Sequence, residues 1–319
     1  MILDIVFLIG GLILLVFAGD YLVKGSVGLA EKLDIPALII GLTIVAFGTS
    51  APELFISLQS AFAGVADIAV GNVIGSNIAN VLLVMGLPAL IAAIHANQRG
   101  LSRNASVMLV FTIIFMWMIS DGLLSRIEAG VLFAGLVVFL VAQILRARAI
   151  MAEDEDTDDL PPDYQNDVGE APHSAGRIAA YLLGGIIGLP IAAHLTVTGA
   201  SNLATVFGIS EAVIGLTIVA IGTSLPELAT SFMAAWRKEA DVALGNIIGS
   251  NIFNIAAIMG ITGMVIPLQI ANQLSNYDMW IMAAVGVVLA VICYAKMTTG
   301  KVLGAGMLIA YGAYIISVF

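Results

Sequence analysis

Charged residues are scarce in this sequence. They make up 11% of its 319 residues and hydrophobic residues make up 60%, whereas a soluble domain carries about 25% charged residues. So few charges cannot cover a folded surface in water, which excludes soluble enzymes, nucleic-acid-binding proteins and secreted disulfide scaffolds. Cysteine is nearly absent as well: Cys293 stands alone, which excludes an internal disulfide and a thiolate metal cluster. We therefore expect an integral membrane protein with the lipid bilayer as its main surroundings.

Long apolar segments recur along the whole chain. A spanning helix needs about 20 mostly apolar residues. The qualifying segments are 4–22, 36–60, 68–94, 104–120, 127–147, 177–198, 211–235, 243–268, 277–295 and 302–318. They predict an all-α integral membrane protein of ten transmembrane helices in preference to a barrel, whose strands would alternate in polarity.

The basic residues predict the orientation of the chain. With ten spans, eleven of the twelve Lys and Arg residues fall on one side and only Arg126 falls on the other. Because the basic side of a membrane protein faces the cytoplasm, both termini are expected outside. Nine of the 22 acidic residues lie in 149–176, which has no Lys or Arg. We interpret this segment as a solvated cytoplasmic linker rather than a cation sensor, because it holds no loop of the EF-hand type.

The two sides of the linker repeat each other at a constant offset of 174. Residues 41–57 (GLTIVAFGTSAPELFIS) match 215–231 (GLTIVAIGTSLPELATS) at 13 of 17 positions, and 67–80 (DIAVGNVIGSNIAN) match 241–254 (DVALGNIIGSNIFN) at 10 of 14. We therefore expect two five-helix repeats, 1–148 and 177–319. An odd number of spans in each repeat makes the copies inverted, as in many secondary transporters with one central site.

Each first motif places a glutamate inside an apolar span. Glu53 and Glu227 are costly there if ionised, so they are candidate functional residues in preference to protonated structural ones. Pro52 and Pro226 break the helix beside them, which frees carbonyls near Ala46 and Ala220 as ligands for a hard cation. The hydroxyl residues at i−4 and i−3 from the glutamates share their helix face. They are Thr49, Ser50, Thr223 and Ser224.

The second motifs add a polar stripe to each partner helix. Residues at i, i+4 and i+8 form the stripes, which are Asn72, Ser76 and Asn80 in one copy and Asn246, Ser250 and Asn254 in the other. Buried amides in lipid need partners. The asparagines of the stripes either ligate an ion directly or orient the carboxylates, and Asn77 and Asn251, on a neighbouring face, are expected to bond between helices. Glycines spaced as GxxxG beside both stripes permit close helix packing.

The predicted site contains oxygen ligands alone. Carboxylates, hydroxyls, amides and carbonyls suit Ca²⁺ or Na⁺ and disfavour Zn²⁺ or Cu²⁺. His95, His173 and His194 lie outside the motifs. We find no nucleophile–base constellation and no nucleotide-binding loop, so we expect neither an enzyme nor a resident cofactor.

The doubled GTSAPE/GTSLPE and GNxIGSNIxN motifs resemble the two alpha-repeats of the cation/calcium exchanger superfamily, in particular the prokaryotic sodium/calcium exchangers. The resemblance implies a secondary antiporter of a prokaryotic inner membrane that exchanges Ca²⁺ for Na⁺ by alternating access. It also implies that Glu53 and Glu227 bind the ions, that the hydroxyls of the motifs (Ser76 and Ser250 included) and two carbonyls add oxygens, and that spans 1 and 6 slide across the core.

One position departs from the family pattern. Sodium/calcium exchangers often carry Asp where this chain has Asn254, so the pocket has two formal negative charges rather than three. This leaves H⁺ coupling open beside Na⁺ coupling. A cation channel and a membrane scaffold without transport remain as more distant alternatives, and the sequence does not predict an oligomeric state.

Overall fold

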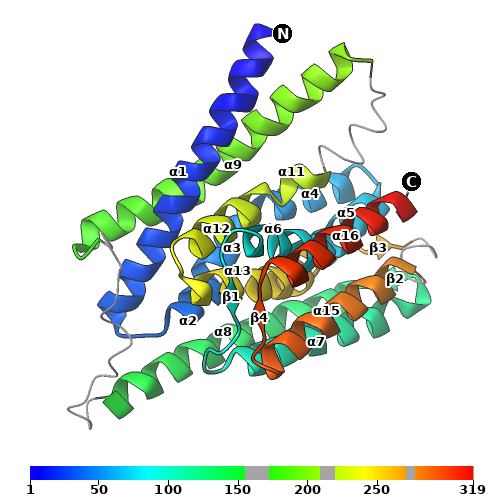
Figure 1. Ribbon diagram of the computed structural model, residues 1–319. Helices are drawn as coiled ribbons and strands as arrows, with labels where there is room; N and C mark the ends of the chain where they lie inside the picture. Colours follow the sequence, from blue (N-terminus) through cyan, green and yellow to red (C-terminus); the bar gives the residue numbers. More distant parts are fainter. Residues whose placement is uncertain (155–171, 209–219, 271–276, 319) are drawn as a thin grey trace.

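The computed structural model of the protein describes residues 1–154, 172–208, 220–270 and 277–318. Its helices are α1 (Ile2–Leu33), α2 (Ala37–Ile40), α3 (Ala46–Thr49), α4 (Ala51–Phe62), α5 (Ala66–Ala79), α6 (Gly86–Ala89), α7 (Leu101–Met118), α8 (Arg126–Asp154), α9 (Ala175–Val206), α11 (Ala220–Thr223), α12 (Leu225–Trp236), α13 (Ala240–Phe253), α14 (Gly260–Val265), α15 (Met279–Tyr294) and α16 (Lys301–Val318) (Figure 1). π-Helical turns occupy Gly41–Val45, Asn80–Val84 and Asn254–Met259, and a 3-10 turn occupies Ile119–Asp121. The all-α fold expected from the sequence is confirmed.

Among the described residues, six helical stretches, three of which run on through π-helical or 3-10 turns, are long and apolar enough to cross a membrane. The pair Ala37–Thr49 and Ala51–Phe62, bent by 43°, is a seventh candidate, and Met279–Tyr294 and Lys301–Ser317 are shorter apolar helices. The first part of the predicted span 211–235 lies outside the described residues. Most of the acidic linker lies outside them as well. The total of ten spans therefore stays a prediction.

The two repeated motifs break their helices at equivalent residues. Ser50 separates α3 from α4 with φ −84° and ψ 5°, and Ser224 separates α11 from α12 with φ −84° and ψ 3°. Proline follows two residues later in each copy and occupies the first turn of the new helix, where its missing N–H costs no hydrogen bond. The local sequence therefore starts a new helix just before each glutamate.

Two small antiparallel pairs join the repeats to each other. β1 (Ile94–His95) pairs with β4 (Thr298–Thr299), and β2 (Leu123–Leu124) pairs with β3 (Leu268–Gln269). The two pairs are related by the offset between the repeats, since 94 corresponds to 268 and 124 to 298. The sequence analysis did not predict these strands. They satisfy backbone groups of the loops at the ends of the spans, where a chain without helix still needs hydrogen bonds.

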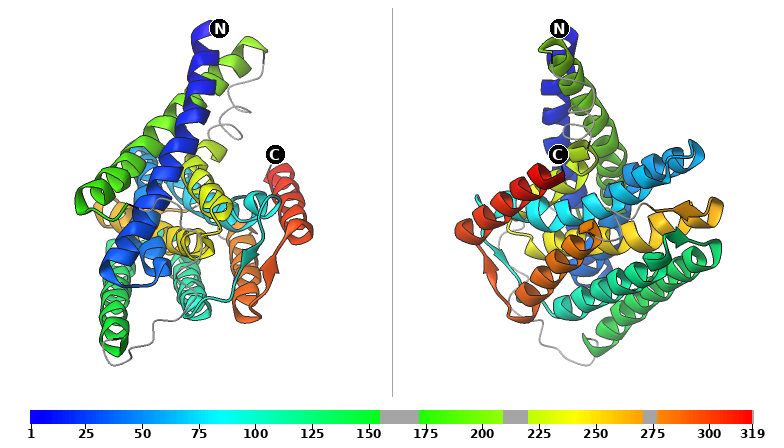
Figure 2. Two further views of the ribbon diagram at one scale, coloured as in Figure 1. Left: turned by 60° about the vertical axis from the view of Figure 1, so that its left-hand side comes forward. Right: turned by 90° about the vertical axis from the view of Figure 1, so that its right-hand side faces the viewer.

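The long helices α1 and α9 pack along each other as a unit, and α1 also packs against α12. Figure 1 shows them crossing on one side of the other helices, and Figure 2 shows both extending beyond the rest of the molecule. Glycines permit the close crossing: a Cβ atom on Gly11 would lie 2.4 Å from the Thr196 hydroxyl, and one on Gly185 would lie 2.5 Å from the Leu22 side chain. Gly11 and Gly185 are themselves equivalent positions of the two repeats. Helices that approach through small residues in this way associate by backbone packing.

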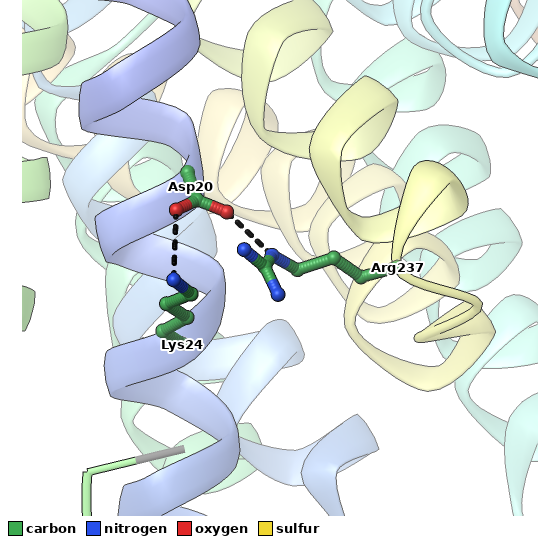
Figure 3. Close-up of polar contacts among 3 residues, drawn as sticks. All are labelled: Asp20, Lys24 and Arg237. Carbon is green, nitrogen blue, oxygen red and sulfur yellow. Dashed lines mark hydrogen bonds and ion pairs between the residues drawn. The ribbon is translucent and has the colours of Figure 1, made fainter. Parts of the chain in front are cut away.

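An ionic contact ties α1 to α12. The Asp20 carboxylate on α1 accepts a hydrogen bond from the guanidinium of Arg237, which follows the last residue of α12, and it lies 3.3 Å from the ammonium group of Lys24 (Figure 3). Asp20 and Lys24 are each 13% exposed and Arg237 is 28% exposed. This cluster links the α1–α9 unit to the helices that carry the repeated motifs.

Candidate functional site

The two glutamates occupy equivalent positions at the start of two helices. Glu53 is the third residue of α4 and Glu227 is the third residue of α12, and both are completely buried. A helix N-terminus carries a partial positive charge, which favours a carboxylate in its first turn. Ser50, three residues before Glu53, contacts the Glu227 carboxylate through its hydroxyl. The structure therefore brings together the acids that the inverted motifs duplicate.

An asparagine on the neighbouring helix supports the backbone of each glutamate. The Asn72 amide on α5 donates to the Glu53 carbonyl at 3.4 Å, and the Asn246 amide on α13 donates to the Glu227 carbonyl at 3.4 Å. Of the two roles that the sequence left open for the stripe asparagines, these two residues have the geometry for orienting the glutamate helices.

The same two amides reach serines that the sequence analysis missed. Asn72 donates to the Ser57 hydroxyl at 3.3 Å, and Asn246 donates to the Ser231 hydroxyl at 3.1 Å. A signal was available, because Ser57 and Ser231 are identical in the two motifs and lie one helical turn after the glutamates. Each support is therefore a three-residue unit that occurs once in each repeat.

The repeats meet through hydroxyl groups at the helix breaks. The Ser50 hydroxyl donates to Glu227 Oε1 at 3.1 Å. The Thr49 hydroxyl lies 3.1 Å from Asn246 Oδ1 and 3.3 Å from the Ser250 hydroxyl. The approach depends on glycine, because a Cβ atom on Gly249 of α13 would lie 2.7 Å from the Ala46 Cβ and 2.8 Å from the Leu42 carbonyl. The packing role predicted for this glycine accounts for how α13 reaches the first motif.

Six buried oxygen atoms of the candidate residues accept no hydrogen bond from any residue that the structure describes. They are both carboxylate oxygens of Glu53, Oε2 of Glu227, the hydroxyl of Ser224 and the Oδ1 atoms of Asn80 and Asn254. A buried polar atom without a partner costs about 1–3 kcal/mol, so six of them on the residues of the repeated motifs need an explanation. These atoms are acceptors with free lone pairs, as ligands of a cation must be.

The remaining predicted residues have varied surroundings. Ser76 on α5 and Thr223 on α11 are buried. The carbonyl of Ala46 already accepts the Ser50 N–H at 3.0 Å and lies 3.3 Å from the Thr49 hydroxyl, because α3 continues to Thr49. The carbonyl that loses its i+4 donor to Pro52 is that of Gly48. Ala220 begins α11, and its side chain lies outside the described residues.

Other reactive side chains lie elsewhere. His95 lies in β1, where its Nδ1 atom is 2.9 Å from the Thr298 hydroxyl, and Cys293 is buried in α15. The described residues include no cluster of three or more His, Cys, Asp or Glu side chains arranged to hold a metal. The chemistry open to the candidate site is the binding of hard cations by oxygen atoms, with two formal negative charges.

Comparison with known proteins agrees with this reading. The family model described as "Sodium/calcium exchanger protein" matches residues 3–145 and 177–319. The chain is 38% identical over 315 residues to the inner membrane protein YrbG of Escherichia coli (strain K12), covering 98% of this chain and 95% of the relative. It is 30% identical over 337 residues to the sodium/calcium exchanger MaX1 of Methanosarcina acetivorans, covering 97% of this chain and 96% of the relative.

A solved structure gives the same result in three dimensions. A structure of the sodium-calcium exchanger NCX_Mj matches with a TM-score of 0.84 and 31% sequence identity, over 100% of this chain and 99% of the other. The match extends over both repeats, which confirms the two-repeat membrane fold expected from the motifs. The chain belongs to the sodium/calcium exchanger protein family, a family of membrane transporters, and lies near its prokaryotic members.

Proposed function

We propose that the protein is a secondary antiporter that exchanges Ca²⁺ for Na⁺ across a prokaryotic inner membrane. The observation that carries this proposal is that six buried oxygen atoms of the two repeated motifs, three of them carboxylate oxygens of Glu53 and Glu227, have no partner among the described residues. A bound cation would offset the cost of leaving these atoms without donors. Glu53 and Glu227 would supply the charge, and the hydroxyls and amides of the motifs would complete the coordination shell.

The charge of the site accounts for obligatory exchange. Glu53 and Glu227 are both completely buried, and two bare carboxylates in a region of low dielectric would repel each other and resist enclosure. One Ca²⁺ neutralises them, and so would two Na⁺, so the loaded forms can change access while the empty form cannot. The long helices α1 and α9, which pack along each other, would be the part that moves. The two repeats, 1–148 and 177–319, would form the transport unit, with the linker 149–176 in the cytoplasm and both termini outside.

Coupling to H⁺ is the second candidate. It is favoured by the two-carboxylate count, since Asn254 stands where a third acid would bind another cation. Two protons neutralise the pair as well as two Na⁺ do. A cation channel is a weaker alternative, because inverted repeats with broken helices favour alternating access.

Uptake of ⁴⁵Ca²⁺ into proteoliposomes with imposed Na⁺ or H⁺ gradients tests the proposal. We expect Ca²⁺ uptake when the Na⁺ concentration is higher inside the vesicles than outside. Ca²⁺ uptake driven by a pH gradient alone would favour the proton-coupled form. Exchange of two Na⁺ for one Ca²⁺ moves no net charge. A third Na⁺ would add one charge per cycle, which couples to voltage by about 2.3 kcal/mol per 100 mV. A strong shift of the Ca²⁺ reversal point with clamped voltage would refute the two-for-one stoichiometry, and unitary currents without a counter-ion would refute exchange.

A further inference from the structure

The ligand groups of Asn80 and Asn254 have two unlike ends. A side-chain amide offers an oxygen that accepts and an NH₂ group that donates, and a half-turn of the amide exchanges them. Only the oxygen can bind a cation. In the structure both Oδ1 atoms are the buried, unpaired ends, and both NH₂ groups are engaged elsewhere: Asn80 donates to Asn251 Oδ1 at 3.0 Å, and Asn254 donates to Asn77 Oδ1 at 3.0 Å.

Asn77 and Asn251 are called here the outer amides. Their orientation is fixed in turn by atoms that can accept a hydrogen bond but cannot donate one. The Asn77 NH₂ group lies 3.4 Å from the main-chain carbonyl of Asn251 and 3.6 Å from the sulfur of Met282. The Asn251 NH₂ group lies 3.5 Å from the sulfur of Met108. Carbonyl oxygens and thioether sulfurs have no proton to give. The NH₂ ends of Asn77 and Asn251 must therefore face them, which leaves both Oδ1 atoms to receive the site asparagines.

The arrangement occurs twice and crosses between the repeats. Met108 and Met282, Asn77 and Asn251, and Asn80 and Asn254 are each pairs of equivalent positions, related by the same offset as the motifs. The outer amide of one repeat holds the ligand amide of the other. Asn77 and Asn251 are each 3% exposed, and Asn80 and Asn254 are 1% and 0% exposed. Water is thus largely excluded as an alternative partner that could hold the amides in the flipped orientation.

We propose that Asn77 and Asn251 are positioning residues that keep the oxygen ends of Asn254 and Asn80 turned toward the ion. This deepens the proposed function and depends on it. Without Asn77, the Asn254 amide has no fixed acceptor for its NH₂ group and can turn that group toward the site. A donor facing a cation lowers affinity, and loss of an outer-shell partner of a metal ligand typically costs about 10- to 100-fold in affinity.

The test is a cycle of variants measured by ⁴⁵Ca²⁺ equilibrium binding to the purified full-length protein in detergent. Asn77→Ala is expected to weaken Ca²⁺ binding about 10- to 100-fold in the wild-type background. In the Asn254→Asp background, the same Asn77→Ala change is expected to have an effect below about threefold. A carboxylate presents an oxygen whichever way it turns, so it does not need an orienting partner.

Equal losses in the two backgrounds would mean that Asn77 acts on the fold alone, and no loss in the wild-type background would mean that it does not act on the ligand; either result overturns the proposal. The mirror-related cycle, Asn251→Ala with Asn80→Asp, gives the same test if the Asn254→Asp protein does not fold. Gln143→Ala is the matched control, because it breaks a buried amide pair with Asn104 at 2.9 Å outside the repeated motifs. Its Ca²⁺ affinity is expected to equal that of the wild type.

Glu53→Gln, measured beside these variants, separates the two proposals. If Glu53→Gln binds Ca²⁺ as tightly as the wild type does, the proposed function is overturned and the inference with it. Binding that depends on Glu53 but not on Asn77 would overturn the inference alone.

Discussion

Replacement of Glu53 by Gln is expected to change Ca²⁺ binding and stability in opposite directions. Glu53 is completely buried, and neither carboxylate oxygen has a donor among the described residues. Removal of one member of a buried ionic interaction costs about 3–5 kcal/mol, which is about a 100- to 4000-fold loss of affinity. Uptake of ⁴⁵Ca²⁺ into proteoliposomes should fall to background. Without ions, however, the variant should unfold at a higher temperature than the wild type, because it no longer holds an uncompensated buried charge.

The pair of measurements separates loss of a ligand from damage to the fold. Ca²⁺ at 100 times its dissociation constant stabilises a protein that binds it only when folded by about 2.7 kcal/mol, so the wild type should show a clear Ca²⁺-dependent rise in its thermal midpoint and Glu53→Gln should show none. Glu128→Gln is the matched control, since Glu128 caps the start of α8 by accepting from Ser125 at 2.7 Å and should leave uptake intact. Retained uptake, or a lowered ion-free midpoint, in Glu53→Gln would refute the reasoning.

Three further predictions concern parts outside the candidate site. A tag inserted in 152–172 should be labelled only from the cytoplasm, because the ten predicted spans place eleven of the twelve basic residues on that side; labelling of intact cells by an impermeant reagent would contradict this. Asp20→Asn removes the ionic contact with Arg237 and should raise the initial rate of Ca²⁺ uptake about fivefold, the equivalent of about 1 kcal/mol. The Ca²⁺ concentration that gives half-maximal uptake should not change. An unchanged rate would exclude that contact as a restraint on α1. Burial, and then the Asp241 charge, raise the pKa of Glu239 to about 7. The folded protein therefore binds this proton more tightly than the unfolded chain, so stability should fall by about 1–2 kcal/mol from pH 5 to pH 8, and Glu239→Gln should flatten that dependence in thermal melts.

The sequence predicted those features that depend on local pattern. Apolar segments predicted helices in a membrane, Pro52 and Pro226 predicted the breaks, and the constant offset between the motifs predicted two related halves. These features follow from a few neighbouring residues, so one sequence is enough to find them.

Features that depend on how the two repeats pack against each other could not be predicted from the sequence. The π-helical turns that begin at Asn80 and Asn254 follow a regular α-helix, and no residue nearby marks the change. The β pairs join loops that belong to opposite halves of the chain. The cross-repeat bond from Ser50 to Glu227 likewise needs the relative placement of α4 and α12. Side-chain periodicity places residues on a face, but the partner of that face is decided by tertiary packing.

The two motifs are nearly identical in sequence, yet their bonds differ. Ser50 donates to Glu227, whereas the equivalent Ser224 hydroxyl has no partner among the described residues, and neither has the Glu53 carboxylate. The two copies of the motif therefore occupy unequal surroundings in this structure. In an inverted repeat, exchange of the two arrangements turns the molecule into its image with the opposite side open. Under the proposed antiport, the unequal bonding of the two copies corresponds to one of two related arrangements, and transport would exchange them.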